Sequence, residues 1–347
     1  MTKLNTGLSG CKLELVNGLL RKHSASVEYN SRLISQAEKQ IVFSKRIYKN
    51  IETPKVHDIE AFYFDMDYVS GQNFEEFFST ASVNDVEFVV STLFDYFDTL
   101  ISTARNVDAS NKILKKIDSL KEKSSYPKYI EFLRKYVENN RMIVPHTFCH
   151  GDLTFANIIF HKNRLFFIDF LDCYVDTFLS DLVKLKQDLH HLWAVRNQDV
   201  YTNRIHQIYS YIWDKLESRY ESFMNESFHI LDALNALRIE PYLTSKRQNV
   251  ILEGIVKSKE LYAISCSSDG GTINPISETE TEVDVVTSDD KSPDGNRGDG
   301  KELIKTLTSD ILHVKIIFLY IIHLWCIYIF IDAITKNHLI ICLRQQS

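Results

Sequence analysis

Residues 148–170 have the sequence FCHGDLTFANIIFHKNRLFFIDF, and the polar residues of this stretch decide how the whole chain is interpreted. Asp152 and Asn157 lie five residues apart in a predicted loop, and Asp169 ends the second of two apolar runs of strand length. Transfer of a phosphoryl group from ATP requires a carboxylate that orients the acceptor hydroxyl, and oxygen ligands for Mg2+. These three residues supply those groups. Asp and Asn are also common in turns, so the interpretation depends on the surrounding chain.

The spacing of these residues resembles a known family. The string H-G-D-L-x-x-x-N at 150–157, the string I-D-F at 168–170, and Asp181-Leu182 with Lys184 are similar to motifs of the aminoglycoside phosphotransferase and choline kinase superfamily. The resemblance is strongest over residues 148–190.

The resemblance implies an α+β fold with the two lobes of a protein kinase. It covers roughly residues 1–265. We expect residues 1–69 to form a small β-rich lobe that binds the nucleotide. Residues 70–264 should form a larger, mainly helical lobe that holds the catalytic and acceptor-binding residues.

The resemblance also implies a role for each residue of the motif. Asp152 would be the catalytic base, and Asn157 and Asp169 would be the ligands of Mg2+. His150 would be a structural member of the same catalytic loop. Asp181 would be a buried partner that supports the loop.

A nucleotide site is predicted before this motif. The segment 6–10 could fold over phosphate because glycine allows a close approach of the backbone; its candidate residues are Gly7, Ser9 and Gly10. Lys22 would direct its ammonium at the phosphates, and Glu38 on the next helix could hold it by an ion pair. Arg21 and Lys12 are the alternative cations.

A hinge between the lobes is predicted next to this site. Met66 and Tyr68 fall where a hinge strand would offer backbone groups to adenine, and Gly71 would begin the second lobe. About six residues precede Gly7. The first strand should therefore be very short.

The pattern of apolar residues predicts further elements. Asn17-Gly18 favours a hairpin between strands at 11–16 and 19–23. A helix should follow Asn30-Ser31, and a strand should lie at 61–69. The later elements should be helical segments at 74–100 and 113–142, strands around Phe148 and at 160–170, and helices through residue 263 that bury the stripe Phe178, Leu182, Leu185, Leu189 and Leu192.

The last part of the chain differs in composition. Residues 265–303 are polar and acidic, which predicts a solvated linker. In the apolar tail, 304–347, the run Ile316–Ile331 is interrupted only by His323. A helix from Lys315 to Ile334 would be about 30 Å long, enough for a membrane anchor. The same run could instead pack on a partner or on the body, or fail to fold stably.

Charge and cysteine usage restrict the partners and the compartment. Residues 1–265 carry 33 Lys and Arg against 34 Asp and Glu, and residues 266–347 carry 7 against 12. Neither part has the basic field that nucleic-acid binding requires. The six cysteines show no zinc spacing, and no secretory signal is visible. We therefore expect a cytoplasmic protein, which the tail could attach to the cytoplasmic face of a membrane.

Some residues near the motif have two interpretations. Asp172 and Asp176 could contact metal or substrate, but a solvated loop is the more common setting for such carboxylates. Nine large aromatic residues between 193 and 242 could surround a quaternary ammonium. Burial in a helical core is the more common role of such rings.

The expected activity is transfer of the γ-phosphate of ATP, with Mg2+, to a hydroxyl of a small molecule of sugar, polyol or amino-alcohol type. Residues 168–189 are also similar to phosphotransferases encoded among bacterial surface-polysaccharide genes. The alternative is a membrane-tethered, catalytically degenerate protein that binds the nucleotide. A protein kinase is disfavoured, because Gly151 and Leu171 stand where such kinases carry Arg and Gly.

Overall fold

The computed structural model describes residues 3–4, 10–195, 203–243, 252 and 256. The chain divides into two compact units, Met1–Ile273 and Asn274–Ser347, and all described residues belong to the first. The predicted linker and the apolar run Ile316–Ile331 lie outside the described residues. Among the helices within the described ranges, none combines the length and the apolar character that crossing a membrane requires.

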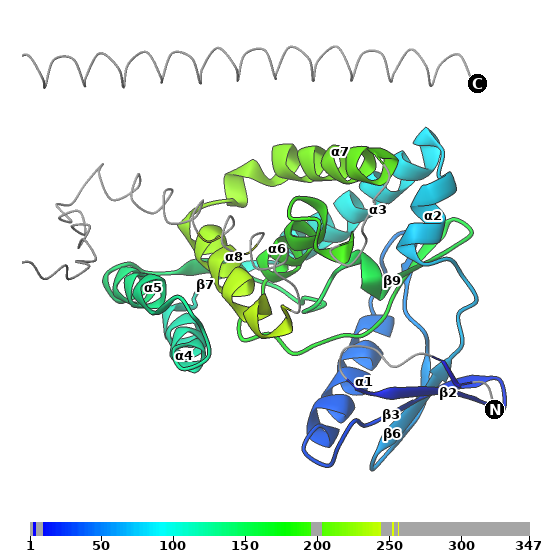
Figure 1. Cartoon of the computed structure of the whole chain (residues 1–347). Coiled ribbons are helices and arrows are strands. Elements are labelled where there is room, and N and C mark those ends of the chain that lie inside the picture. Colours follow the sequence, from blue (N-terminus) through cyan, green and yellow to red (C-terminus); the bar gives the residue numbers. More distant parts are fainter. Residues whose placement is uncertain (1–2, 5–9, 196–202, 244–251, 253–255, 257–347) are drawn as a thin grey trace, which may run out of the picture. The chain divides into compact units, whose positions relative to one another are not determined.

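An antiparallel sheet forms the N-terminal part of this unit (Figure 1). The tight turn of the predicted hairpin is confirmed, with Asn17 and Gly18 at φ 52° and 83°. The first strand is a two-residue edge strand, as its predicted shortness requires. In spatial order the strands are β1 (Lys3–Leu4), β2 (Lys12–Val16), β3 (Leu19–His23), β6 (Tyr63–Asp67) and β5 (Val56–Glu60).

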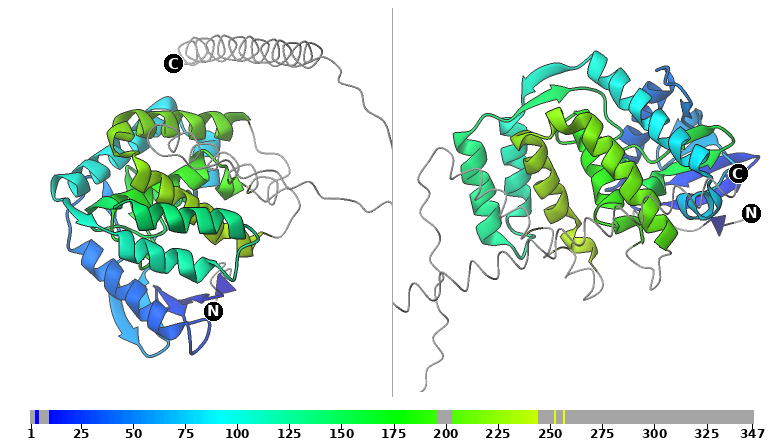
Figure 2. Two further views of the ribbon diagram at one scale, coloured as in Figure 1. Left: turned by 90° about the vertical axis from the view of Figure 1, so that its left-hand side faces the viewer. Right: turned by 90° about the horizontal axis from the view of Figure 1, so that it is seen from above.

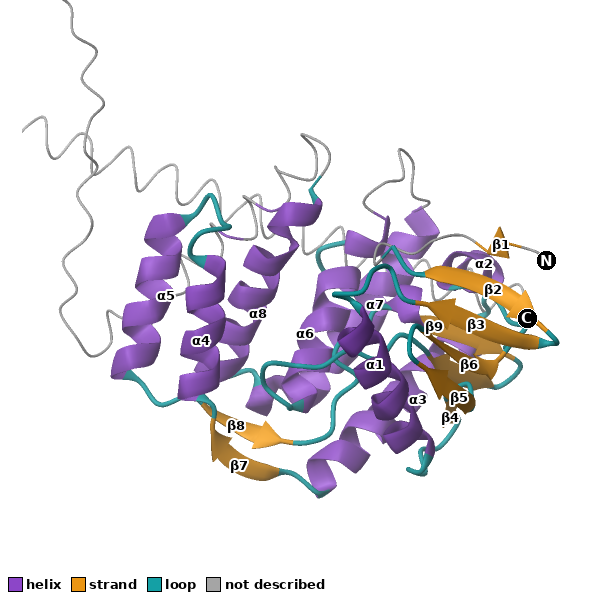
Figure 3. Cartoon of the chain, turned by 90° about the horizontal axis from the view of Figure 1, so that it is seen from below, coloured by secondary structure: helices purple, strands orange, loops and turns teal. Residues whose placement is uncertain are grey.

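Helix α1 (Asn30–Ser44) packs on one face of this sheet and continues into the rest of the unit. Leu33 and Ala37 share a small core with Phe64 and Met66 of β6. Phe43, near the other end of α1, belongs to the larger core of the helical part. Figure 3 shows α1 between the sheet and the helices. One helix therefore belongs to both hydrophobic cores.

The larger part is mainly helical, and together with the sheet it confirms the predicted two-lobed α+β fold. Helices α4 and α5 lie side by side in Figures 1 and 2. The helices are α2 (Phe74–Thr80), α3 (Val83–Ser102), α4 (Ser110–Leu120), α5 (Pro127–Asn139), α6 (Phe178–Leu189), α7 (Asn203–Tyr220) and α8 (Glu226–Ile239). The short strands are β4 (Ile51–Glu52), β7 (Arg105–Asp108), β8 (Ile143–His146), β9 (Ile158–His161) and β10 (Arg164–Phe167).

Two predicted helical segments are each divided in the structure. The segment 74–100 breaks because Asn73 and Ser82 both form capping boxes, so that each residue begins its own helix. The segment 113–142 breaks before Pro127, which occupies the first turn of α5. The strand predicted around Phe148 is wrong, because β8 ends at His146 and Phe148 lies in a loop.

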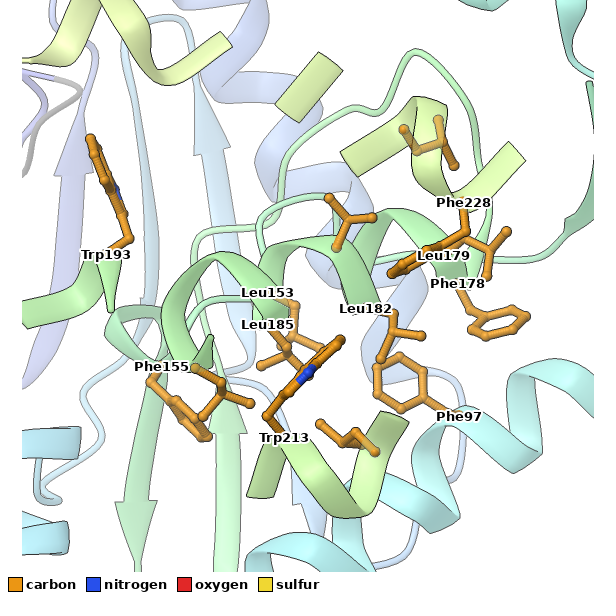
Figure 4. Packing of buried hydrophobic residues seen from close by; sticks show 14 of the residues in the cluster. Phe97, Leu153, Phe155, Phe178, Leu179, Leu182, Leu185, Trp193, Trp213 and Phe228 are labelled. Carbon is orange, nitrogen blue, oxygen red and sulfur yellow. The ribbon is translucent and has the colours of Figure 1, made fainter. Parts of the chain in front are cut away.

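The core of the helical part surrounds α6 (Figure 4). The predicted stripe on this helix is buried as far as Leu189, whereas Leu192 lies beyond the helix and is only partly buried. Most of the aromatic rings between 193 and 242 that the structure describes are also buried, which favours the interpretation as core; they are Trp193, Tyr209, Trp213, Tyr220 and Phe228.

The segment that connects the lobes lies directly against β9. The main chains of Gln72 and Phe160 exchange two hydrogen bonds of 2.8 and 2.9 Å. A Cβ atom on Gly71 would lie 2.5 Å from Ile159 Cγ2 and 2.7 Å from the carbonyl oxygen of Phe160. Glycine is therefore required at this point by the close approach of two backbones.

Replacement of Gly71 by Ala should lower the free energy of unfolding by about 1–3 kcal/mol, because the new methyl group must displace the main chain of β9. Urea unfolding of the variant and the wild-type protein measures this difference. The control is Ser70→Ala, an exposed neighbour, with an expected change below about 0.5 kcal/mol. Equal stabilities of the two variants would contradict the close packing of this segment.

Candidate active site

The loop His150–Asn157 has a backbone that only glycine permits at its second position. Gly151 has φ +91°, and a Cβ atom there would lie 2.0 Å from the carbonyl oxygen of Leu171. The N–H of Leu171 donates to the carbonyl of His150 at 3.0 Å. The segment that follows Asp169 is therefore held directly against this loop.

A buried carboxylate fixes the start of the loop. Asp181, in the first turn of α6, accepts hydrogen bonds from the N–H groups of His150 at 2.7 Å and Gly151 at 2.8 Å. The hydroxyl of Tyr96 donates to it at 3.0 Å. Burial raises the pKa of Asp181 to about 6, although the two N–H groups oppose that rise. Three donors therefore satisfy a carboxylate that burial alone would disfavour.

His150 connects the two halves of the motif. Its Nε2–H donates to the carbonyl oxygen of Ile168 at 2.8 Å, and its Nδ1 accepts the N–H of Asp152 at 3.2 Å. Complete burial lowers the pKa of His150 to about 4. A neutral ring with both nitrogens occupied cannot exchange a proton with a substrate. The geometry therefore assigns His150 a structural role in the loop.

Asp152 is held from several directions. Its Oδ1 lies 2.9 Å from Lys184 Nζ and 3.5 Å from Arg238 Nη2. Asn157 Nδ2 donates to Asp152 Oδ2 at 3.2 Å and to its carbonyl oxygen at 2.8 Å. The amide nitrogen of Asn157 is therefore occupied, and the amide oxygen is the atom that remains for a further ligand.

Asp169 is in contact with the N-terminal sheet. It adopts a left-handed backbone with φ 60°. Its Oδ1 lies 2.7 Å from Nζ of Lys22, whose side chain is almost completely buried. The same ammonium donates to Gln36 Oε1 at 3.0 Å. The structure thus joins Lys22 and Asp169, which are 147 positions apart in the sequence.

The predicted ion pair between Lys22 and Glu38 is wrong. Glu38 is exposed on α1, and the residue that holds Lys22 is Gln36. Residues two positions apart on a helix point in directions about 200° apart. A polar residue at position 36 therefore reaches the ammonium, and one at position 38 faces solvent.

Strand alternation distinguishes Lys22 from the alternative cations. Arg21 points to the opposite face of β3, where its guanidinium binds both oxygens of Asp65 at 2.7 Å. Lys12 is exposed. Among these three side chains, Lys22 is the one that contacts a residue of the motif.

The other predicted nucleotide residues are only partly described. Gly7 and Ser9 lie outside the described residues, and Gly10 has φ +72°. The side chain of Met66 is buried in the core of the small lobe, and Tyr68 is half-exposed. Among the described residues, no backbone hydrogen bond involves the main chain of Tyr68, Val69 or Ser70.

Asn157 and Asp169 carry the kind of oxygen atom that a magnesium ion binds. Mg2+ prefers one or two carboxylates together with other oxygen ligands. Asp169 Oδ2 and the amide oxygen of Asn157 have no hydrogen-bond partner among the described residues, although each side chain is fixed by its other polar atom. Both side chains therefore present an available oxygen in a fixed orientation.

A sequence comparison identifies the family. The phosphotransferase enzyme family, abbreviated APH, matches residues 36–218, which are more than half of the chain. The chain belongs to this family.

Solved structures similar to this phosphotransferase include enzymes with several acceptors. The aminoglycoside phosphotransferase APH(2'')-IIa, in complex with streptomycin and ATP, has 16% identity and a TM-score of 0.49, with 78% of this chain and 91% of that chain covered. A putative fructosamine-3-kinase from Thermobifida fusca has 11% identity, a TM-score of 0.47 and coverage of 75% and 93%. An ethanolamine kinase from Plasmodium vivax has 13% identity and a TM-score of 0.40, with 74% of this chain and 84% of that chain covered. No curated protein matches the sequence.

Several polar residues of the phosphotransferase site were not assigned from the sequence. Gln36 and Lys39 lie three positions apart on α1, and Lys39 Nζ donates to the carbonyl of Leu171. Lys184 follows Asp181 by three positions on α6, a spacing that puts both on one helix face. That spacing was a usable signal for Lys184. No local signal exists for Arg238, because α8 meets Asp152 only through the tertiary fold.

Stability of the phosphotransferase should depend on the buried histidine below neutral pH. The pKa of His150 is about 4 in the folded protein against 6.5 in a model peptide. The unfolded chain therefore binds a proton first as the pH falls, and folding stability is lost. Relative to His150→Asn, which cannot titrate here, the wild-type protein should lose about 3 kcal/mol of unfolding free energy between pH 7 and pH 4.

Urea unfolding of both proteins across this pH range provides the measurement. Asp181 has the opposite effect on the free energy of unfolding. Its pKa is raised in the folded protein, so its contribution lowers the stability as the pH rises above 4. That contribution is present in both proteins and cancels in the difference. A difference in stability that stays constant with pH would contradict a neutral, buried His150.

Proposed function

We propose that this phosphotransferase moves the γ-phosphate of ATP to a hydroxyl group of a small molecule. Two contacts carry the proposal. Asn157 donates to Asp152 within the loop, and Lys22 of the small lobe pairs with Asp169 of the large lobe. Sugars, polyols and amino alcohols are the acceptor types that we propose.

Asp152 is the proposed base. A base must have a fixed direction and a free lone pair toward the hydroxyl. Lys184 holds Oδ1, and the amide of Asn157 donates to Oδ2. Each carboxylate oxygen can accept about two hydrogen bonds. Oδ2 therefore keeps one acceptor position for the hydroxyl of the acceptor.

The nucleotide would be held from the small lobe. Lys22 is the buried cation beside Asp169 and would contact the phosphates of ATP. The main chain of Tyr68–Ser70, which makes no backbone–backbone hydrogen bond with the described residues, would be available to the adenine edge. Mg2+, bound by Asn157 and Asp169, would neutralise charge on the transferring phosphoryl group.

The alternative, a nucleotide-binding protein without turnover, predicts that one of the reactive groups is displaced. The loop instead keeps Asp152 fixed by Lys184 and Asn157. A role in surface-polysaccharide metabolism and attachment to a membrane through residues 316–331 are separate hypotheses. Fractionation of cells that express the full chain or residues 1–265 tests the attachment, since equal solubility of the two would exclude it.

The Asp152→Asn variant should lose about 100- to 10,000-fold in kcat, because general-base catalysis contributes that factor. It should still gain thermal stability from Mg·ATP. Asp169→Asn should lose both activity and the magnesium-dependent part of the gain in Tm. Release of ADP and thermal unfolding with ATP, with and without Mg2+, are the two measurements.

Asp172→Asn is the matched control, because Asp172 is an exposed carboxylate three residues after Asp169. This variant should keep both the activity and the magnesium-dependent gain in Tm. Loss of nucleotide binding in Asp152→Asn, or full activity in Asp169→Asn, would contradict the assigned roles. Binding of Mg·ATP without transfer to any hydroxyl compound would favour the non-catalytic alternative.

A further inference from the structure

Arg238 and Lys116 lie on two helices that pack against each other, and Arg238 contacts Asp152. Arg238, near the end of α8, places Nη2 3.5 Å from Asp152 Oδ1. Helix α4 packs against α8 and carries Lys116, whose ammonium lies 5.8 Å from the centre of the Tyr174 ring. Figure 3 shows α4 and α8 on the opposite side of α6 from the five-stranded sheet. An acceptor that reached Asp152 from this side would meet Arg238.

Lys116 has no acidic partner in the part of the chain that the structure describes. Its side chain is partly buried, and none of the ion pairs formed by the described residues includes it. Burial lowers the pKa of Lys116, and the positive charges of Arg238 and Lys123 lower it further. The charges that act on this ammonium are therefore of its own sign.

Nearby acidic residues are occupied elsewhere. Glu240, just beyond α8, accepts hydrogen bonds from Ser124 Oγ at 2.6 Å and from the N–H of Ser125 at 2.8 Å. Asp118, on α4, pairs with Arg134 of α5. Asp152 itself is shared with Lys184. Among the described residues, Arg238 pairs with the Asp152 carboxylate that Lys184 also contacts, and Lys116 pairs with no carboxylate. Positive charge is therefore in excess here, and a bound anion would offset it.

We propose that Arg238 and Lys116 form a subsite for an anionic group, so that the acceptor is a hydroxyl compound that also carries a carboxylate or phosphate. The proposal rests on the proposed function, since Asp152 must orient a hydroxyl of the same molecule. The planar guanidinium of Arg238 suits two oxygens of such a group, and Lys116 adds a point charge.

The reaction itself is unchanged by this subsite. The acceptor oxygen forms a bond to the γ-phosphorus, the bond from that phosphorus to the β,γ-bridging oxygen breaks, ADP leaves, and the hydroxyl proton passes to Asp152. A cationic acceptor would meet the guanidinium of Arg238 beside Asp152 and the ammonium of Lys116 on the neighbouring helix. The subsite therefore narrows the proposed acceptor types: it disfavours amino alcohols, amino sugars and quaternary amines, and it favours sugar acids, polyol acids and their phosphates.

Matched acceptors test the charge preference. D-glycerate and glycerol 3-phosphate should be used with kcat/KM at least about 10-fold above that of glycerol, and ethanolamine should be the poorest substrate. Lys116→Gln and Arg238→Gln should lower the ratio of anionic to neutral kcat/KM about 10-fold or more, mainly through KM. Lys115→Gln, an exposed neighbour on α4, should leave the ratio unchanged. A comparison of the two anions separates carboxylate from phosphate recognition.

Binding without turnover gives an independent result. Calorimetry with D-glycerate, D-glucuronate, glucose 6-phosphate and inorganic phosphate should show binding to the wild-type protein and to Lys115→Gln, and weaker binding to Lys116→Gln. Preferred transfer to neutral or cationic acceptors would overturn the subsite and leave the proposed function standing. Absence of all transfer despite Mg·ATP binding would remove the proposed function, and the binding series would still decide the subsite. If none of these anions binds to the wild-type protein, the proposed subsite is overturned.

Discussion

The contact between the Asp181 carboxylate and two consecutive N–H groups is the constraint on which the site depends. It fixes the peptide planes of His150 and Gly151, directly before Asp152. The left-handed backbone of Gly151 then brings the carbonyl of Leu171 close to it. Because an isolated buried carboxylate is strongly disfavoured, Asp181 is tolerable only while these donors are present. The loop and the start of α6 therefore stabilise each other.

The segment after β10 connects this loop to the other lobe. Three consecutive residues of it each contact a different side chain: Asp169 contacts Lys22, the Phe170 ring lies 4.9 Å from that of Phe43, and the carbonyl of Leu171 accepts from Lys39. Phe43 and Lys39 both belong to α1. A movement of α1 would therefore shift Asp169, the carboxylate that we propose as a ligand of magnesium.

The sequence predicted the parts of the site that depend on local spacing. Asp152 and Asn157 are close in the chain, and the turn at Asn17-Gly18 follows from two residues. The partner of Lys22 was missed because helix phase decides between Gln36 and Glu38, and the first residue of α1 does not fix that phase well enough. Arg238 was missed for a different reason: its contact with Asp152 joins α8 to a loop 86 positions earlier, and no local pattern encodes such a contact.

Asn157 links the two chemical tasks of the site. Its amide nitrogen donates to both the carbonyl and the carboxylate of Asp152, so its side chain cannot rotate without releasing the proposed base. Its amide oxygen makes neither of these contacts and stays available as the proposed metal ligand. An aspartate at this position would supply an oxygen for the metal but would place it against the Asp152 carboxylate, where like charges repel. An amide satisfies both requirements, which is the physical reason for an asparagine between the proposed base and the proposed metal site.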